Sequence, residues 1–148
     1  MISAMLFIWE LPQNLLGLLV FVIMKNRRRI VKIEREKHRF FIETPYTGVS
    51  LGWIVFWTPA GNRFIYLIND CRMHELGHAR QSARLGPFYL LVVGISSLSR
   101  VFYRWWYLKR HKQNWMNYYN GYPENRADVL GGIMNPSRND IHDNYFRS

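Results

Sequence analysis

The chain opens with an apolar stretch that differs from everything after it. Residues 1–24 contain one charged residue, Glu10, and few other polar ones. A helix of this length would be about 36 Å long, enough to cross a bilayer. Pro12 and Glu10 argue against a span, because proline disturbs a helix and a carboxylate is costly at membrane depth. We therefore expect an apolar N-terminal helix that either anchors the chain in a membrane or packs at its interface or on the core.

Short stretches of β-type residues follow the basic run at residues 25–29. Apolar and polar positions alternate over parts of residues 30–43, and residues 48–57 are apolar and rich in β-branched and aromatic side chains. Turn signals, Thr44-Pro45 and then residues 58–62, follow each of these segments. The pattern predicts two or three short antiparallel strands.

A helix is predicted over residues 71–85. Asn69 and Asp70 precede it, and such side chains cap a helix by accepting hydrogen bonds from the free N–H groups of its first turn. Gly86 and Pro87 end it, because glycine accepts a left-handed C-terminal conformation and proline cannot continue the hydrogen-bond ladder.

Four further segments are distinct in the rest of the chain. Residues 88–98 are apolar and predict a second helix, buried or dipping into a membrane but too short to span it alone. Residues 114–122 are rich in Asn and Tyr and predict a loop or a frayed helix. A short helix is expected from Pro123, a favoured first helical position, to Gly131-Gly132. The polar tail after Met134 is expected to be loosely held.

Composition limits what the chain can be. Its 148 residues suit one domain, here residues 25–148 after the N-terminal helix of residues 1–24. Cys71 is the only cysteine, so a metal site would have to use histidines and carboxylates. The formal net charge of +10 indicates attraction to something acidic, such as anionic lipid or nucleic acid.

The basic residues gather in two segments. Under the positive-inside rule, the run at residues 25–29 would place the rest of the chain on the cytoplasmic side of a membrane. Residues 100–112 mix Arg, Lys and His with Trp and Tyr. Such a segment suits a membrane interface, a solvated face over a core, or a nucleic-acid surface with bases stacked on the rings. The apolar N-terminus favours the membrane.

The clearest chemistry lies in the sequence HELGH at residues 74–78. On a helix, His74 and His78 are a turn apart on one face, where both imidazoles can bind a single ion. Glu75 reaches the same side. In zinc hydrolases with this pattern the glutamate does not bind zinc but takes a proton from the water that zinc activates, and can pass it to the leaving amine. The alternative is that two surface histidines flank a glutamate by chance.

A zinc hydrolase needs a third protein ligand. His38, His111 and His142 are available, but no pattern supports them. Glu124 and Asp128 are four residues apart on a predicted helix and share one face of it. Glu124 could therefore bind the metal, while Asp128 could accept the outer N–H of a ligand histidine and fix its tautomer. The alternative is an ordinary solvated acidic helix face.

Together, HELGH at residues 74–78 and ENRADVLG at residues 124–131 resemble the paired motifs of gluzincin metallopeptidases of the CAAX prenyl protease and HtpX type. The resemblance covers about residues 71–85 and 122–132. It implies a peptide or protein substrate, and it suits membrane association, since many members of that family are membrane proteins. It also implies a bound Zn²⁺ and a role for each of five residues: His74, His78 and Glu124 as zinc ligands, Glu75 as general base and acid, and Asp128 as the partner of a ligand histidine.

Two features of such enzymes have several candidates here. Related enzymes often bind substrate as an extra strand at a sheet edge beside the zinc helix, and residues 49–57 could form that edge or an ordinary core strand. The group that steadies the oxyanion could be any of Tyr118, Tyr119, Tyr122, Arg126 and His142.

We therefore expect an α+β fold: a small zincin-like domain with a short antiparallel sheet, an active-site helix and a second ligand helix. The expected function is membrane-associated, zinc-dependent hydrolysis of peptide bonds. One alternative is a zinc protein in which the same ligands only stabilise the fold, and such a site has no use for Glu75. Another is a basic module that binds membranes or nucleic acid and carries HELGH by chance.

Overall fold

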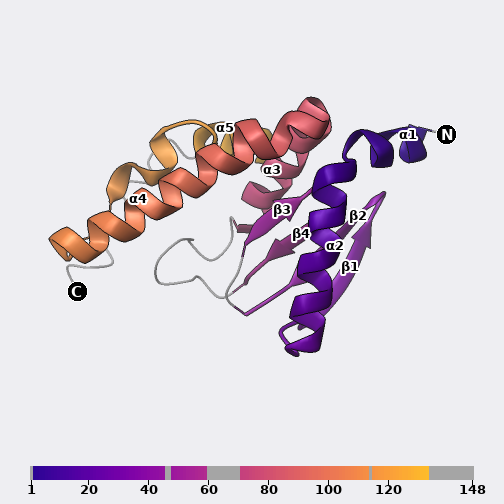
Figure 1. The fold of residues 1–148 in the computed structure, drawn as a ribbon, viewed down its shortest axis with the longest axis horizontal. Helices are drawn as coiled ribbons and strands as arrows, with labels where there is room; N and C mark the ends of the chain where they lie inside the picture. The colour runs from indigo at the N-terminus through magenta and orange to yellow at the C-terminus, as the bar shows by residue number, and fades with distance from the viewer. Residues whose placement is uncertain (1, 46–47, 60–70, 114, 134–148) are drawn as a thin grey trace.

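A computed structural model describes residues 2–45, 48–59, 71–113 and 115–133 of the chain. It shows an α+β fold in which a four-stranded sheet lies between helices (Figure 1). The elements in chain order are α1 (Ile2–Trp9), α2 (Leu11–Asn26), β1 (Lys32–Glu36), β2 (Arg39–Glu43), β3 (Val49–Leu51), β4 (Ile54–Trp57), α3 (Cys71–Leu85), the 3-10 turn η1 (Gly86–Phe88), the π-helical turn η2 (Leu90–Gly94), α4 (Ile95–His111), the 3-10 helix η3 (Met116–Asn120) and α5 (Glu124–Gly131).

The strands form a mixed sheet in the order β1-β2-β4-β3. β1 pairs with β2 and β3 pairs with β4 in antiparallel register, but β4 runs parallel to β2. The sheet thus has four strands where two or three were predicted, and the predicted antiparallel pairing holds for β1 with β2 and β3 with β4 but is wrong for β2 with β4. β3 takes the far edge, and the chain returns through β4 to the place beside β2. Alternation within a strand does not specify its neighbour, so the pattern could not reveal this order.

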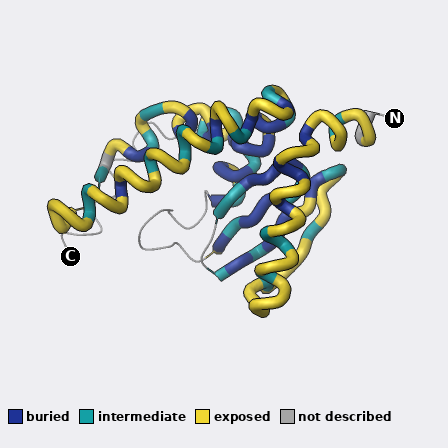
Figure 2. The backbone as a smooth tube through the Cα atoms, in the orientation of Figure 1, coloured by how far each residue is buried: buried dark blue, intermediate teal, exposed yellow. Residues whose placement is uncertain are grey.

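The two faces of the sheet are covered by different helices. Successive residues of a strand point to opposite faces. On one face Phe41 and Val55 pack with Ala79 of α3, and on the other Ile42 and Phe56 pack against α2. The central strands are buried, whereas β1 is largely exposed (Figure 2). Apolar contacts therefore place α3, which carries the two histidines, against the sheet.

The apolar N-terminus forms two helices instead of one. They meet at Glu10, and Pro12 lies in the first turn of α2, where proline is tolerated. Glu10 is fully buried against the domain: Ser82 Oγ donates to its Oε1 at 2.5 Å, and Arg39 Nη2 lies 3.5 Å from the same oxygen. Within the described ranges no single helix is long and apolar enough to cross a membrane.

The chain turns sharply after α3. Gly86 has a φ of +53°, and a Cβ there would lie 2.2 Å from the Trp9 ring, so the turn requires glycine. The segments at residues 88–98 and 100–112, which the sequence analysis treated separately, belong largely to one helical stretch, residues 90–111. The chain bends by 118° between residues 71–88 and this stretch. Most of the apolar side chains of this stretch are exposed. Of the two alternatives for residues 88–98, the buried helix is therefore wrong, and the helix that dips into a membrane stays a prediction.

The remaining helices follow the predictions. α3 and α5 have the expected bounds, and residues 116–120 form a short 3-10 helix where a loop or frayed helix was expected. The proposed cap at residues 69–70 and the tail after Met134, with His142, lie outside the described residues.

Candidate metal centre

Helices α3 and α5 lie in close contact, and glycines permit this. A Cβ on Gly77 would lie 1.9 Å from the carbonyl oxygen of Ala127, and one on Gly131 would lie 2.2 Å from that of Met73. Real side chains cannot approach so closely, so a larger residue at either position would push the helices apart. The small residues therefore bring the acidic face of α5 against the histidine face of α3.

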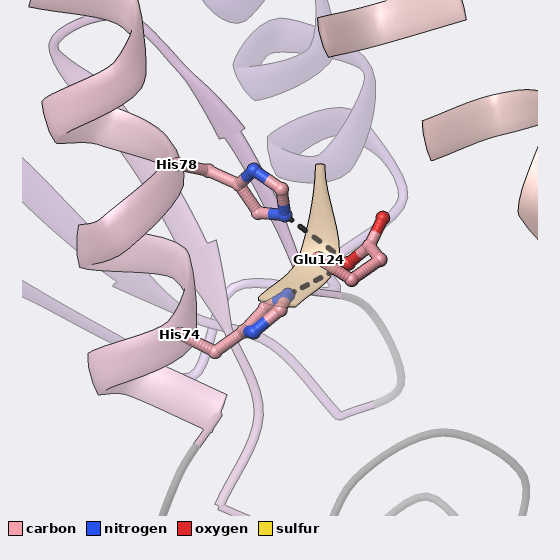
Figure 3. A group of neighbouring side chains, drawn as sticks. All are labelled: His74, His78 and Glu124. Atoms are coloured by element: carbon pink, nitrogen blue, oxygen red, sulfur yellow. Dashed lines mark hydrogen bonds and ion pairs between the residues drawn. The ribbon is translucent and has the colours of Figure 1, made fainter. Parts of the chain in front are cut away.

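His74, His78 and Glu124 meet at this contact, as the sequence predicted (Figure 3). Glu124 Oε2 lies 3.0 Å from His74 Nε2 and 3.3 Å from His78 Nε2. Each residue offers one possible ligand atom, and these three atoms all lie within 4.8 Å of one another. All three side chains are buried. His38 packs beside Trp53 and His111 ends α4, so neither belongs to this group.

Hydrogen bonds on the outer side of the rings orient them. Asp128 Oδ1 lies 2.6 Å from His74 Nδ1, the contact that the sequence predicted. Gln81 Oε1 lies 2.8 Å from His78 Nδ1, and the amide of Gln81 donates to the carbonyl of Pro123 at 3.1 Å. Because the oxygens can only accept, the Nδ1 atoms carry the hydrogens, and the Nε2 atoms face Glu124.

Sequence reasoning missed two residues of this arrangement. Gln81 is three positions after His78 on α3, so helical spacing could have indicated it. Ser97, whose Oγ donates to Glu124 Oε1 at 2.5 Å, comes from α4 and has no sequence signal that links it to the motifs. Glu124 is thus contacted on one oxygen by the histidines and on the other by the serine.

The electrostatics of the group favour a positive charge between the side chains. Burial alone would lower the pKa of His74, but its hydrogen bonds to Asp128 and Glu124 outweigh this and raise the pKa to about 9. Burial would raise the pKa of Glu124, but hydrogen bonds to His74 and His78 hold it well below its usual range. A proton can supply that positive charge, and so can a metal cation. The group therefore fits a metal ion by both its donor atoms and its charge.

A cavity of about 620 Å³ opens beside the group. Glu75, His78 and Glu124 form part of its wall, and most of the remaining wall is apolar. Edge strand β3 also lines it, whereas β4 is central, so residues 49–57 contain both an edge strand and a core strand. Glu75 is only 2 % exposed and belongs to the same cavity wall as His78 and Glu124.

The five candidates for steadying an oxyanion lie in different places. Tyr118 lines the cavity, and burial raises the pKa of its phenol, so the hydroxyl keeps its proton. The Tyr119 ring meets the His74 ring edge-on, with centroids 5.6 Å apart. Tyr122 and Arg126 are exposed, and His142 lies outside the described residues.

Fold and site together define an α+β protein with a buried group of two histidines and one glutamate that could hold a metal ion. Comparison with known proteins returned no match to a family model, a curated protein or a solved structure. The likeness to gluzincins therefore rests on the two motifs and on the side chains that they bring together.

Proposed function

We propose that this protein is a zinc-dependent peptidase. The observation that carries the proposal is the meeting of His74, His78 and Glu124, of which His78 and Glu124 line a cavity together with Glu75. Two imidazole nitrogens and a carboxylate oxygen are a ligand set that catalytic zinc uses, with a further position left for water or substrate. The cavity gives that position room.

Each side chain has a defined task in this proposal. A zinc ion held by the three ligands would act as a Lewis acid and lower the pKa of water toward ~7. Glu75 accepts the proton of the attacking water and returns it to the leaving amine. Tyr118, which stays protonated, donates a hydrogen bond to the carbonyl oxygen as negative charge develops on it. The edge strand β3 offers main-chain groups to an extended peptide.

The proposal can be tested with the purified full chain, first by metal analysis and then with a quenched-fluorescent peptide library. We expect one zinc per chain and measurable hydrolysis. Glu75→Gln should keep the zinc and lower the rate by about 10²- to 10⁴-fold, the usual contribution of a general base. Lys37→Gln, which changes an exposed residue in the turn between β1 and β2, serves as the control and should act like the wild type.

Two results would reject parts of this proposal. Stoichiometric zinc without hydrolysis, or with equal hydrolysis by Glu75→Gln, would favour a zinc site that only stabilises the fold. A chain that binds no zinc would make HELGH a chance occurrence, as in a basic membrane-binding or nucleic-acid-binding module.

A further inference from the structure

Exposed apolar side chains gather on two helices that flank the cavity. Leu16 and Val20 of α2 and Leu98 and Val101 of α4 line the cavity, so the helices stand on either side of it. Both helices also contain large apolar residues that are exposed, and most of their length is coloured as exposed in Figure 2. On α2 these include Leu11, Leu15, Leu18, Leu19 and Val22, and on residues 90–111 they include Leu91, Ile95, Leu98, Phe102 and Trp105.

The spacing of these residues makes a continuous apolar stripe on each helix. Positions 11, 15, 18 and 22 on α2, and 91, 95, 98, 102 and 105 on the second helix, follow the three-and-four spacing of one helical face. Leu98 and Phe102 are each 66 % exposed. A soluble monomer rarely leaves apolar patches of this extent in water, so a partner is expected to cover them.

Each stripe ends in basic residues. Lys25, Arg27, Arg28 and Arg29 follow the stripe of α2, and Lys109, Arg110 and Lys112 follow that of α4. Lys109 Nζ lies 5.0 Å from the centre of the Trp105 ring. Trp residues favour the headgroup region of a bilayer, and neighbouring Lys and Arg reach anionic phosphates. Apolar stripes with basic ends therefore match an anionic lipid surface.

We propose that α2 and α4 form a docking surface for an anionic phospholipid bilayer. Their apolar stripes enter the boundary between headgroups and acyl chains, and the basic ends bind lipid phosphates. Docking places the cavity, which lies between the helices, next to the lipid. The docking does not depend on the proposed hydrolysis. If both hold, the peptidase acts on segments presented at the membrane surface.

The test is sedimentation of the purified chain with vesicles of phosphatidylcholine, with and without phosphatidylglycerol. We expect binding to the anionic vesicles that weakens with added salt. The paired change Leu18→Glu and Leu19→Glu, and separately Phe102→Glu, should weaken binding at least about tenfold. The control is Val129→Glu, because Val129 is 65 % exposed but lies on α5, which carries neither stripe.

A second pair of variants tests the charge. Lys109→Glu with Arg110→Glu should remove most of the preference for anionic vesicles, whereas Lys37→Glu, at an exposed turn, should not. Circular dichroism checks that each variant is folded. Failure of the wild type to bind either vesicle would overturn the proposal, as would an equal loss in the controls. A stable dimer that does not bind vesicles would also overturn it, because a second copy would then cover the stripes.

The hydrogen bonds behind the metal group support an independent inference, which rests on the proposed metal site. We infer that Ser97 and Gln81 are positioning residues for that site. Ser97 holds Glu124 Oε1 at 2.5 Å, while Oε2 faces the histidine nitrogens. The serine therefore leaves a single oxygen of Glu124 for an ion. Such ligation by one oxygen would keep a position free for water.

Gln81 acts on the other side of the site. Its oxygen accepts from His78 Nδ1, and its amide donates to the carbonyl of Pro123, which precedes Glu124. One side chain thereby orients a ligand of α3 and holds the start of α5. Partners of this kind usually change metal affinity by about 10- to 100-fold when they are removed.

Zinc affinity, measured by competition with a chelator, tests this inference, and so does the visible spectrum of the cobalt-substituted protein. Ser97→Ala and Gln81→Ala should each weaken zinc binding about 10- to 100-fold and alter the cobalt bands. Gln81→Glu keeps an acceptor for His78 and should recover most of the affinity.

Two neighbouring serines provide controls. Ser96 donates to the carbonyl of Val92 and Ser99 to that of Ser96, both in the same helical stretch of residues 90–111, so Ser96→Ala and Ser99→Ala should leave zinc affinity unchanged. A wild type that binds zinc while both positioning variants keep full affinity and unchanged cobalt bands would overturn the inference and leave the metal site intact. A wild type without zinc would remove the site itself, and the inference with it.

Discussion

Helix α3 carries two groups of buried polar side chains, and their charge balance differs. In the first group, which lies near the N-terminal helices, Ser82 of α3 donates to Glu10, and Glu10 forms an ion pair with Arg39. The other contains His74 and His78 and faces Glu124 of α5. Both include a buried carboxylate, yet only the second borders the large cavity.

The Glu10 group has its positive charge built into the chain. Glu10 receives a hydrogen bond from Ser82 and lies beside the Arg39 guanidinium, and Arg39 also donates to the carbonyl of Ala79 at 2.8 Å. Gln13 donates to Ser82 Oγ at 3.0 Å and to the carbonyl of Gly86 at 2.9 Å. The charges of Glu10 and Arg39 balance each other within the chain, so we call this the closed group. Its contacts join α2, the sheet and α3 and stabilise their packing.

The Glu124 group must take its positive charge from solution. Its ion-pair partners among the described residues are the imidazoles of His74 and His78, and an imidazole carries a positive charge only after it takes up a proton. In this group the pKa of His74 is raised to about 9, so its imidazole can hold a proton at neutral pH. An exchangeable cation next to a cavity permits metal chemistry, whereas a covalently attached guanidinium in a closed group does not. Four predictions test this contrast, in order of expected effect.

Breaking the closed group should cost the most stability. Arg39→Met leaves Glu10 buried without its cation, and loss of one partner of a buried ion pair typically costs about 3–5 kcal/mol. Urea denaturation of the metal-free protein measures the loss. Adding Glu10→Gln to Arg39→Met should recover part of it, since the remaining amide carries no charge. Unchanged stability of the single variant would show that the ion pair is not structural.

Removing the carboxylate of the Glu124 group should instead abolish tight zinc binding. Glu124→Ala is expected to weaken zinc affinity by more than the ~100-fold upper range of an outer hydrogen-bond partner, because it removes a direct ligand. Chelator competition measures this, with the exposed Asn125→Ala as control. Normal affinity in Glu124→Ala would mean that another group completes the site.

Removal of the metal should further distinguish the Glu124 group from the Glu10 group. A ligand present at a hundred times its dissociation constant stabilises the folded chain by about 2.7 kcal/mol. A chelator should therefore lower the unfolding midpoint of the wild type. The chelator should lower the unfolding midpoint of the Ser99→Ala control by the same amount. It should leave the midpoint of Glu124→Ala unchanged. An equal response to the chelator in Glu124→Ala would disprove the assigned site.

The smallest effect is expected from separating α3 and α5. Gly77→Ala places a Cβ against the carbonyl of Ala127, and such overpacking typically costs about 1–3 kcal/mol. It should also weaken zinc binding, because the ligands on the two helices move apart. Gly94→Ala is the matched control, since its Cβ would meet nothing closer than 3.8 Å. Equal behaviour of the two variants would contradict the close contact.

Several conclusions needed only the relations between residues that are close together in the sequence. The bounds of α3 and α5, and the placing of His74 with His78 and of Glu124 with Asp128 on shared helix faces, follow from helical spacing. The class of metal ligand followed from the single cysteine and the HELGH motif. These features depend only on residues within a few positions of one another, and such relations are the same wherever the helix lies.

Tertiary structure decided the rest. The parallel pairing of β2 with β4, the burial of Glu10 beside Arg39, and the approach of Ser97 to Glu124 all join residues from different elements. Their proximity depends on how the sheet and helices pack, and packing is a property of the whole chain. The sequence by itself thus determined which side chains could bind a metal. Only the fold decided that they meet beside a cavity, while the other buried carboxylate found its cation within the chain.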